Sequence, residues 1–193
     1  MAHPDATLDS VGGTSTAQAS RLRSNATLLQ DESMGWDYPQ PFTMSVAPKG
    51  DDIDGLNHTN NVVYVQWCGT IGWTHSEALG IHLADYQRLD RGMAIRRADY
   101  HYLLPTTVGD ELTLGTWLLG GDGKLTIERR FQLIRNRDYA TVLRGCWKLV
   151  CIELSSGRPR RMPPELLCTF RVAIEGRPQL NSDSTEPGAD ARA

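Results

Sequence analysis

The chain has 193 residues, with 20 Lys and Arg against 23 Asp and Glu, a formal net charge of −3, and 40% hydrophobic residues. This composition is typical of a soluble domain and argues against a duplex-binding protein, which usually has a basic balance or a basic face. No window holds the run of about twenty apolar residues that crosses a bilayer, and residues 1–30 lack a hydrophobic signal segment. We therefore expect a cytoplasmic protein without a membrane span or a nucleic-acid partner.

The distribution of residue types divides the chain into three parts. Residues 1–35 and 176–193 are rich in small and polar residues with little apolar periodicity, so we expect disordered tails there. Residues 36–175 contain all five tryptophans and have the size of one compact domain.

The first elements of this domain are predicted to be a strand, a loop and a long helix. Residues 40–47 alternate as a short strand does, and a polar, turn-rich loop follows over residues 48–58. Residues 60–80 begin with a capping-type Asn and end at a Gly suited to a left-handed cap, which predicts a helix. Apolar residues cover nearly its whole circumference, so we expect burial on every side, with Gly69 and Gly72 where sheet backbone approaches closely.

Strand-like stretches occupy the remainder of the domain. They are separated by turn residues, and their alternating charges predict an antiparallel sheet with one wet and one dry face. A short helix from Pro163 to about Arg171 is expected to close the core. The Gly-rich segment at residues 120–124 lacks the flanking residues of a phosphate-binding loop and is predicted to be a hairpin turn. The predicted strands are residues 92–104, 110–119, 124–135 and 141–154.

The four cysteines and five histidines show no metal-site spacing. There is no CxxC pair and no HExxH motif, so we predict no metal. Cys68, Cys146, Cys151 and Cys168 fall in segments that read as core, and we expect buried, reduced thiols.

The segment Asp52-Ile-Asp54-Gly-Leu-Asn-His58-Thr-Asn60-Asn61-Val-Val-Tyr64 resembles the D-x-D-x-x-x-H-x-N-N-x-x-Y signature of the 4-hydroxybenzoyl-CoA thioesterase-like group and its acyl-ACP relatives. Residues 98–110 are similar to that family's second block, a strand leading to Pro and a Gly-Asp turn. Together with the element order, the resemblance implies an α+β hotdog fold, in which a curved antiparallel sheet of about five strands wraps a long central helix.

The resemblance also implies hydrolysis of an acyl-CoA or acyl-ACP thioester. The substrate carbonyl would lie at the start of the buried helix, where unpaired N–H groups and a partial positive charge suit an oxyanion. The expected donor is the backbone N–H of Asn61 or Val62, with Asn61 preferred. Asp54 would act as general base to a water or as nucleophile. Taken without the signature, Asp54 in an Asp-Gly turn would more simply bond its own backbone.

Other residues of the signature are assigned supporting roles. His58 would orient the water, hold the thioester or fix the loop, and structural and functional readings are equally open. Asn60 is expected to cap the helix, and Tyr64 to line the acyl pocket or pack on the sheet. Arg160 and Arg161 are candidates for the CoA phosphates, beside the simpler reading of a solvated turn. The predicted substrate-binding set is Asn60, Val62, Tyr64, Arg160 and Arg161.

The sequence departs from its relatives in one informative place. Where related enzymes carry an acid on the central helix, this chain has Cys68 to Gly72, and Glu77 lies too far along to replace it. We therefore expect a mechanism that depends on Asp54 alone, with CoA only as part of the substrate and no further cofactor. A non-catalytic acyl-CoA or acyl-ACP binding protein is the alternative, and a hotdog dehydratase ranks last. Open sheet edges predict a homo-oligomer, a dimer or tetramer.

Overall fold

Five strands form one antiparallel sheet in the order β1-β3-β4-β5-β2 in the computed structural model, which describes residues 34–175. Each predicted strand is confirmed, with ends shifted by a few residues. β2 does not pair with β3, the next strand in the chain, but crosses to the far edge beside β5. The strands are β1 (Phe42–Val46), β2 (Arg91–Tyr102), β3 (Leu112–Leu119), β4 (Thr126–Arg135) and β5 (Ala140–Glu153).

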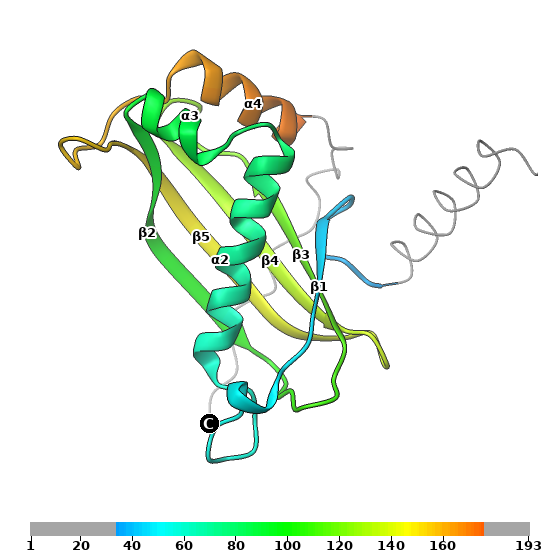
Figure 1. Ribbon diagram of the computed structural model, residues 1–193. Coiled ribbons are helices and arrows are strands. Elements are labelled where there is room, and N and C mark those ends of the chain that lie inside the picture. Colours follow the sequence, from blue (N-terminus) through cyan, green and yellow to red (C-terminus); the bar gives the residue numbers. More distant parts are fainter. Residues whose placement is uncertain (1–33, 176–193) are drawn as a thin grey trace, which may run out of the picture. The chain divides into compact units, whose positions relative to one another are not determined.

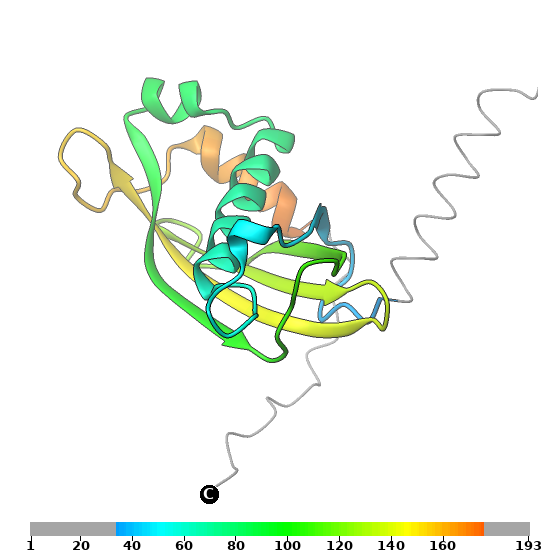
Figure 2. The ribbon, with the colours of Figure 1, turned by 60° about the horizontal axis from the view of Figure 1, so that its bottom comes forward.

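The central helix α2 (Asn61–Ala78) lies across the concave face of this sheet, and the strands bend around it (Figures 1 and 2). The helix ends where predicted, since Gly80 follows its last turn with a φ of +82°. This arrangement confirms the hotdog fold. The tails predicted for residues 1–35 and 176–193 lie, except for residues 34 and 35, outside the described residues.

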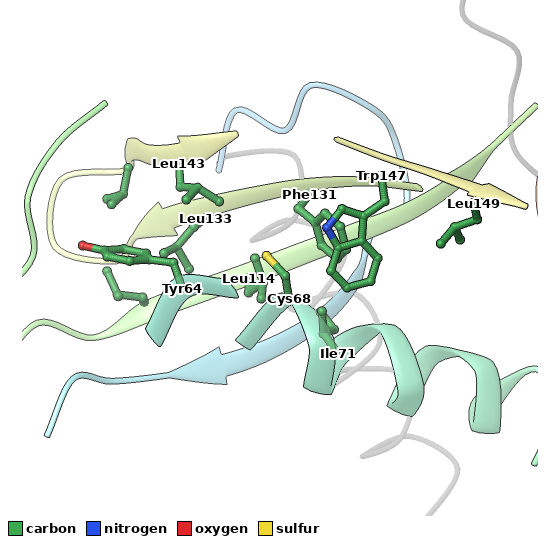
Figure 3. Close-up of a cluster of buried hydrophobic side chains, with 11 residues drawn as sticks. Tyr64, Cys68, Ile71, Leu114, Phe131, Leu133, Leu143, Trp147 and Leu149 are labelled. Atoms are coloured by element: carbon green, nitrogen blue, oxygen red, sulfur yellow. The ribbon is translucent and has the colours of Figure 1, made fainter. Parts of the chain in front are cut away.

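One stripe of α2 packs on the sheet. Tyr64, Cys68 and Ile71 recur every three to four residues, so they lie on one face and point at the strands (Figure 3). They contact large side chains of β3, β4 and β5, among them Phe131 and Trp147. The rings of these two residues pack edge to face, with 4.7 Å between the ring centroids. This cluster is the core that fixes the helix against the sheet.

The expectation that α2 is buried on every side is wrong for the single chain. Val62 is 60% exposed, Val65 37% and Trp73 52%. The sheet curves around one side of the helix only, and the rest of residues 34–175 leaves these side chains partly uncovered, although the ring of Trp73 packs edge to face on that of Tyr86 with 5.8 Å between the ring centroids.

The two helix glycines also have a different role from the predicted one. A Cβ on Gly72 would meet the ring of Trp147 at 3.4 Å, so its neighbour is a side chain and not sheet backbone. A Cβ on Gly69 would meet nothing within 4 Å. Both glycines therefore leave open space beside the helix.

The outer face of the sheet is only partly wet. Residues 36–41 cover β3 and β4 there, where the indole N–H of Trp117 donates to the Pro39 carbonyl and the Asp37 N–H donates to Gln132 Oε1. A Cβ on Gly115 would lie 2.7 Å from the ring of Trp36, so this covering requires a glycine. Gln132, on the face predicted to be wet, is therefore fully buried.

Three short elements complete the described chain: η1 (Gly50–Asp52), α3 (Leu83–Arg88) and α4 (Pro164–Glu175). α4 confirms the predicted closing helix and is longer than expected, while α3 was not predicted. The prediction of buried cysteines holds for Cys68 and Cys151 and is wrong for two others, since Cys168 on α4 is exposed and Cys146 is only half-buried. In residues 34–175 no three His, Cys, Asp or Glu side chains gather as metal ligands would. None of the helices described there is long and apolar enough to cross a membrane.

Candidate functional site

The loop before α2 folds back on itself as a short hairpin. Ile53 pairs with Thr59, flanked by hydrogen bonds from the Asn60 N–H to the Asp52 carbonyl and from the Asp54 N–H to the His58 carbonyl, each 2.8 Å. Residues on one strand alternate between faces, so Ile53 and Thr59 share the inner face. Asp54 and His58 therefore lie opposite each other on the outer face, on the same side as Asn60.

The Asp54 carboxylate is held by its own loop. Its Oδ1 accepts from the N–H of Leu56 at 2.8 Å and from that of His58 at 3.3 Å. This is the turn-forming role that Asp in an Asp-Gly turn favours. Within residues 34–175 no hydrogen bond engages Oδ2, which leaves that oxygen as a fixed acceptor on the outer face.

The start of α2 offers one backbone donor. Asn60 caps the helix as predicted, because its Oδ1 accepts from the Val62 N–H at 3.0 Å, and its carbonyl accepts from the Val63 N–H at 2.9 Å. In the described part of the chain no acceptor faces the Asn61 N–H. Of the two amides that the sequence offered as oxyanion donors, Val62 is thus committed to the cap and Asn61 is the available one.

A chain of buried hydroxyls ties this helix start to the loop between β2 and β3. Thr59 Oγ1 donates to the Thr106 carbonyl at 3.0 Å, and Thr106 Oγ1 donates to Thr59 Oγ1 at 2.7 Å. The Tyr64 hydroxyl lies 2.8 Å from Thr106 Oγ1. Tyr64 therefore packs on the sheet and braces the site, and Thr106 is a supporting residue that sequence reasoning missed.

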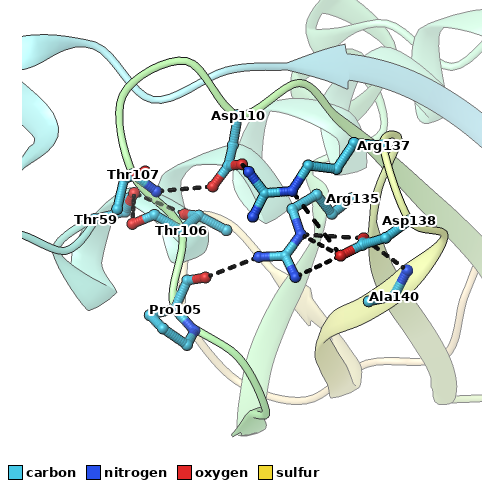
Figure 4. Close-up of polar contacts among 9 residues, drawn as sticks. All are labelled: Thr59, Pro105, Thr106, Thr107, Asp110, Arg135, Arg137, Asp138 and Ala140. Carbon is cyan, nitrogen blue, oxygen red and sulfur yellow. Dashed lines mark hydrogen bonds and ion pairs between the residues drawn. The ribbon is translucent and has the colours of Figure 1, made fainter.

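The same loop is clamped to the β4–β5 hairpin (Figure 4). Buried Asp110 accepts from the Thr107 N–H at 2.9 Å and pairs with Arg137 at 3.0 Å. Arg135 donates to the Pro105 carbonyl at 3.4 Å and pairs with Asp138 at 2.8 Å. These contacts hold residues 105–110 against the β4–β5 hairpin. Because Thr106 in this segment bonds Thr59, the hairpin of Asp54 is fixed as well.

The remaining predicted residues lie in two places. His58 is exposed beside Asp54, and Val62 is exposed on the first turn of α2. Arg160 lies beside Glu153, at 3.5 Å, where β5 pairs with the first residue of β2, and Arg161 follows it. β2 then runs for 12 residues, about 35 Å, before it reaches the α2 start at Tyr102. One chain therefore does not bring Arg160 and Arg161 to Asp54.

An apolar cavity of about 440 Å³ lies between the second half of α2 and the first residues of β2. Gly69, Gly72, Trp73 and Ser76 form its helix wall, and α3 and α4 each contribute aromatic residues. Buried Arg129, predicted on the dry face, lines it too, with Nη1 3.0 Å from His75 Nδ1. The volume is typical of a small-molecule pocket. The sequence predicted that Gly69 and Gly72 lie on the helix, but it did not predict the cavity beside them.

Comparison with known proteins agrees with this architecture. Curated proteins give no sequence match. A hypothetical protein from Staphylococcus aureus in complex with CoA superposes with a TM-score of 0.69 and 16% identity, over 82% of this chain and 99% of its own. A 1,4-dihydroxy-2-naphthoyl-CoA thioesterase from Synechocystis gives 0.61 and 16%, over 76% and 100%.

A 12:0-ACP thioesterase from Umbellularia californica has a TM-score of 0.64 and 14% identity, over 78% of this chain and 60% of its own. At these identities the likeness shows the fold. The model of the thioesterase-like superfamily matches residues 48–170, which include the hairpin of Asp54, α2 and the whole wall of the cavity. The chain belongs to the thioesterase-like superfamily.

Proposed function

We propose that this protein hydrolyses acyl thioesters of CoA or of acyl carrier protein at the start of α2. The observation that carries the proposal is the N–H of Asn61, which has no acceptor within residues 34–175, at the end of the hairpin that holds the Asp54 carboxylate with Oδ2 available. Membership of the thioesterase-like superfamily supports the reaction class. The neighbours named above act on an aromatic and on a 12-carbon acyl group, so their names leave the acyl group of this protein open.

In the proposed reaction, the thioester carbonyl oxygen accepts a hydrogen bond from the Asn61 N–H. The helix dipole and this donor stabilise the negative charge that develops as the carbonyl carbon becomes tetrahedral. Asp54 Oδ2 takes a proton from a water whose oxygen attacks that carbon, and collapse of the intermediate expels the thiolate, which receives the proton. Direct attack by Oδ2, giving a mixed anhydride that water then hydrolyses, is the other route for the same carboxylate.

We further propose that the active form is a homo-oligomer. β2 is an edge strand, and no strand of residues 34–175 pairs with its outer side. Val62 on α2 is 60% exposed and Ile95 on β2 is 50% exposed. An unpaired strand edge and exposed apolar side chains both favour pairing with a second chain. A second copy would also be the source of Arg160 and Arg161 for the CoA phosphates. Light scattering should give at least twice the mass of one chain, and a monomer would contradict this.

The direct test is thiol release from acyl-CoAs by the purified protein and two variants. Asp54→Asn removes the proposed base and should lower kcat by about 10²-fold or more, the scale of general-base catalysis. Asp51→Asn is the matched control, because Asp51 is exposed on the same segment and has no role in the proposed chemistry. Equal thiol release by wild type and Asp54→Asn, with both folded, would reject the mechanism.

A second candidate function is non-catalytic binding of acyl-CoA or acyl-ACP. Two observations favour it. Asp54 Oδ1 accepts a hydrogen bond within its own turn. Glu77, the first acid on α2, lies about 24 Å along the helix from Asn61, too far to assist the reaction there. Saturable binding of acyl-CoA without any thiol release would select this function.

A further inference from the structure

The cavity lies at a defined distance from the proposed reaction centre. Gly69 follows Asn61 by eight residues and Ser76 by fifteen, which at 1.5 Å per residue places the helix wall of the cavity about 12 to 22 Å beyond the helix start. An extended carbon chain advances about 1.2 Å per bond. A chain that starts at the helix start therefore enters the cavity after roughly ten bonds and reaches its far end after roughly eighteen.

A continuous stripe of α2 connects the two places. Val62, Val65, Gly69, Gly72 and Ser76 are spaced by three or four residues, so they share one face of the helix. In the first half of the stripe the two valines are apolar and exposed, and in the second half the residues are small and border the cavity. The second half of this face is turned toward β2, because Gly92 to Ile95 form the opposite wall of the cavity.

We propose that this cavity is the acyl pocket and that the protein's substrates carry long, unbranched alkyl chains of about ten carbons or more, with Gly72 as the residue that sets the accepted length. The inference rests on the proposed function for the position of the thioester. The chain runs along the stripe from Val62, passes Gly69 and ends between α2 and β2.

Geometry and chemistry both favour this class of substrate. An aromatic ring bonded directly to the carbonyl carbon ends near the first turn of α2 and leaves the cavity empty. The lining beyond Gly69 is mainly aliphatic and aromatic, with Leu118, Ile127 and Leu149 from the sheet, which suits methylene groups. Each methylene moved from water into such surroundings strengthens binding by up to about fourfold.

The role of Gly72 follows from its neighbour. A Cβ at Gly72 would lie 3.4 Å from Trp147, so alanine fits at ordinary contact, whereas a leucine side chain has no place except the cavity. Thr70→Ala is the matched control, since Thr70 is exposed on the same helix, does not line the cavity, and also changes helix propensity when replaced by alanine.

The test measures kcat/KM for saturated acyl-CoAs from C4 to C18 and for benzoyl-CoA. Wild type should prefer chains of C10 or longer by at least tenfold over C4 and over benzoyl-CoA. Gly72→Leu should lose this preference and keep C4 turnover within threefold, Gly72→Ala should shorten the optimum, and Thr70→Ala should retain the wild-type profile. A wild-type preference for benzoyl-CoA or C4, or an unchanged profile in Gly72→Leu, would overturn the proposal.

A binding measurement separates this inference from the proposed function. Free fatty acids from C6 to C18 are titrated while the fluorescence of the protein is followed, because Trp73 and Trp147 line the cavity. Length-dependent binding that Gly72→Leu abolishes would support the pocket even if no thioester is hydrolysed, in which case only the proposed activity fails. Hydrolysis without length-dependent binding would reject the pocket and keep the activity. If Gly72→Leu does not fold, Gly72→Ala decides the same comparison.

Discussion

The buried hydroxyl chain at the α2 start has a definite direction. Thr59 gives its proton to the Thr106 carbonyl, and Thr106 gives its proton to Thr59 Oγ1. A hydroxyl has one proton to donate, so Thr106 Oγ1 is the acceptor for Tyr64, and the Tyr64 hydroxyl is the donor. Tyr64, Thr106 and Thr59 are 3%, 0% and 3% exposed, so water does not replace a lost partner.

This direction predicts unequal effects of two isosteric substitutions. Thr106→Val leaves the Tyr64 hydroxyl as a buried donor without acceptor and removes the donor to Thr59, which should lower the free energy of unfolding by about 3 kcal/mol. Tyr64→Phe leaves the Thr106–Thr59 pair intact and should cost about 1 kcal/mol. In the double variant no buried hydroxyl is orphaned at Tyr64, so the loss should be about 2 kcal/mol, below that of Thr106→Val alone, and not the sum of about 4 kcal/mol.

The assay is equilibrium urea unfolding of the four proteins, followed by fluorescence and far-UV circular dichroism. The expected coupling free energy is about 2 kcal/mol, which exceeds the usual additivity error of about 0.3–0.5 kcal/mol. Additive losses, or a larger loss for Tyr64→Phe than for Thr106→Val, would refute the direction of the hydroxyl chain.

Two further predictions concern titratable groups. Backbone N–H groups of Leu125, Thr126 and Lys124 hold the pKa of the Asp122 carboxyl below its ordinary value of 3.8, so this carboxylate stabilises the fold above about pH 4 and less as pH falls toward its folded pKa. Asp122→Ala should therefore cost about 1 kcal/mol at pH 7 in urea unfolding, and a difference that stays constant from pH 5 to pH 2 would contradict this. Burial raises the pKa of the Cys68 thiol to about 12, whereas Cys168 is exposed. At pH 8 an aromatic disulfide reagent should label Cys168 at least 100-fold faster than Cys68, and a fast phase that persists in Cys168→Ser would show the assignment to be wrong.

The sequence predicted the fold closely because its local signals agree with one another. Asn60 and Gly80 bound α2, and the strands keep their alternation, so element type and order followed directly. The partner of β2 did not follow, because strand pairing across the sheet depends on the crossover and leaves no local mark. The burial of Gln132 was missed for a similar reason. Asp37, which contacts it, is 95 positions away in the sequence.

The candidate site was predicted in part. The signature gathered Asp54, His58 and the Asn60 cap in one stretch of chain, and the hairpin places them on one face. It offered two amides and preferred that of Asn61, and the structure adds the physical reason, because Asn60 uses the Val62 N–H and not that of Asn61. Thr106 was missed because it is 47 residues from Thr59 and carries no motif of its own.

The one anomaly of the α2 sequence connects these findings. A helix that is apolar on nearly every side was expected to be enclosed by its own sheet, yet Val62, Val65 and Trp73 face outward. These side chains are 37% to 60% exposed, so each forgoes roughly half of the ~1.5–3 kcal/mol that full burial contributes. Several such positions close together are typical of a binding surface. The inner stripe of α2 forms the core. The proposed acyl chain covers the stripe of Val62 and Val65, and the proposed second copy covers what the acyl chain leaves exposed. The apolar circumference of the helix therefore has three neighbours: the sheet, the acyl chain and the second copy.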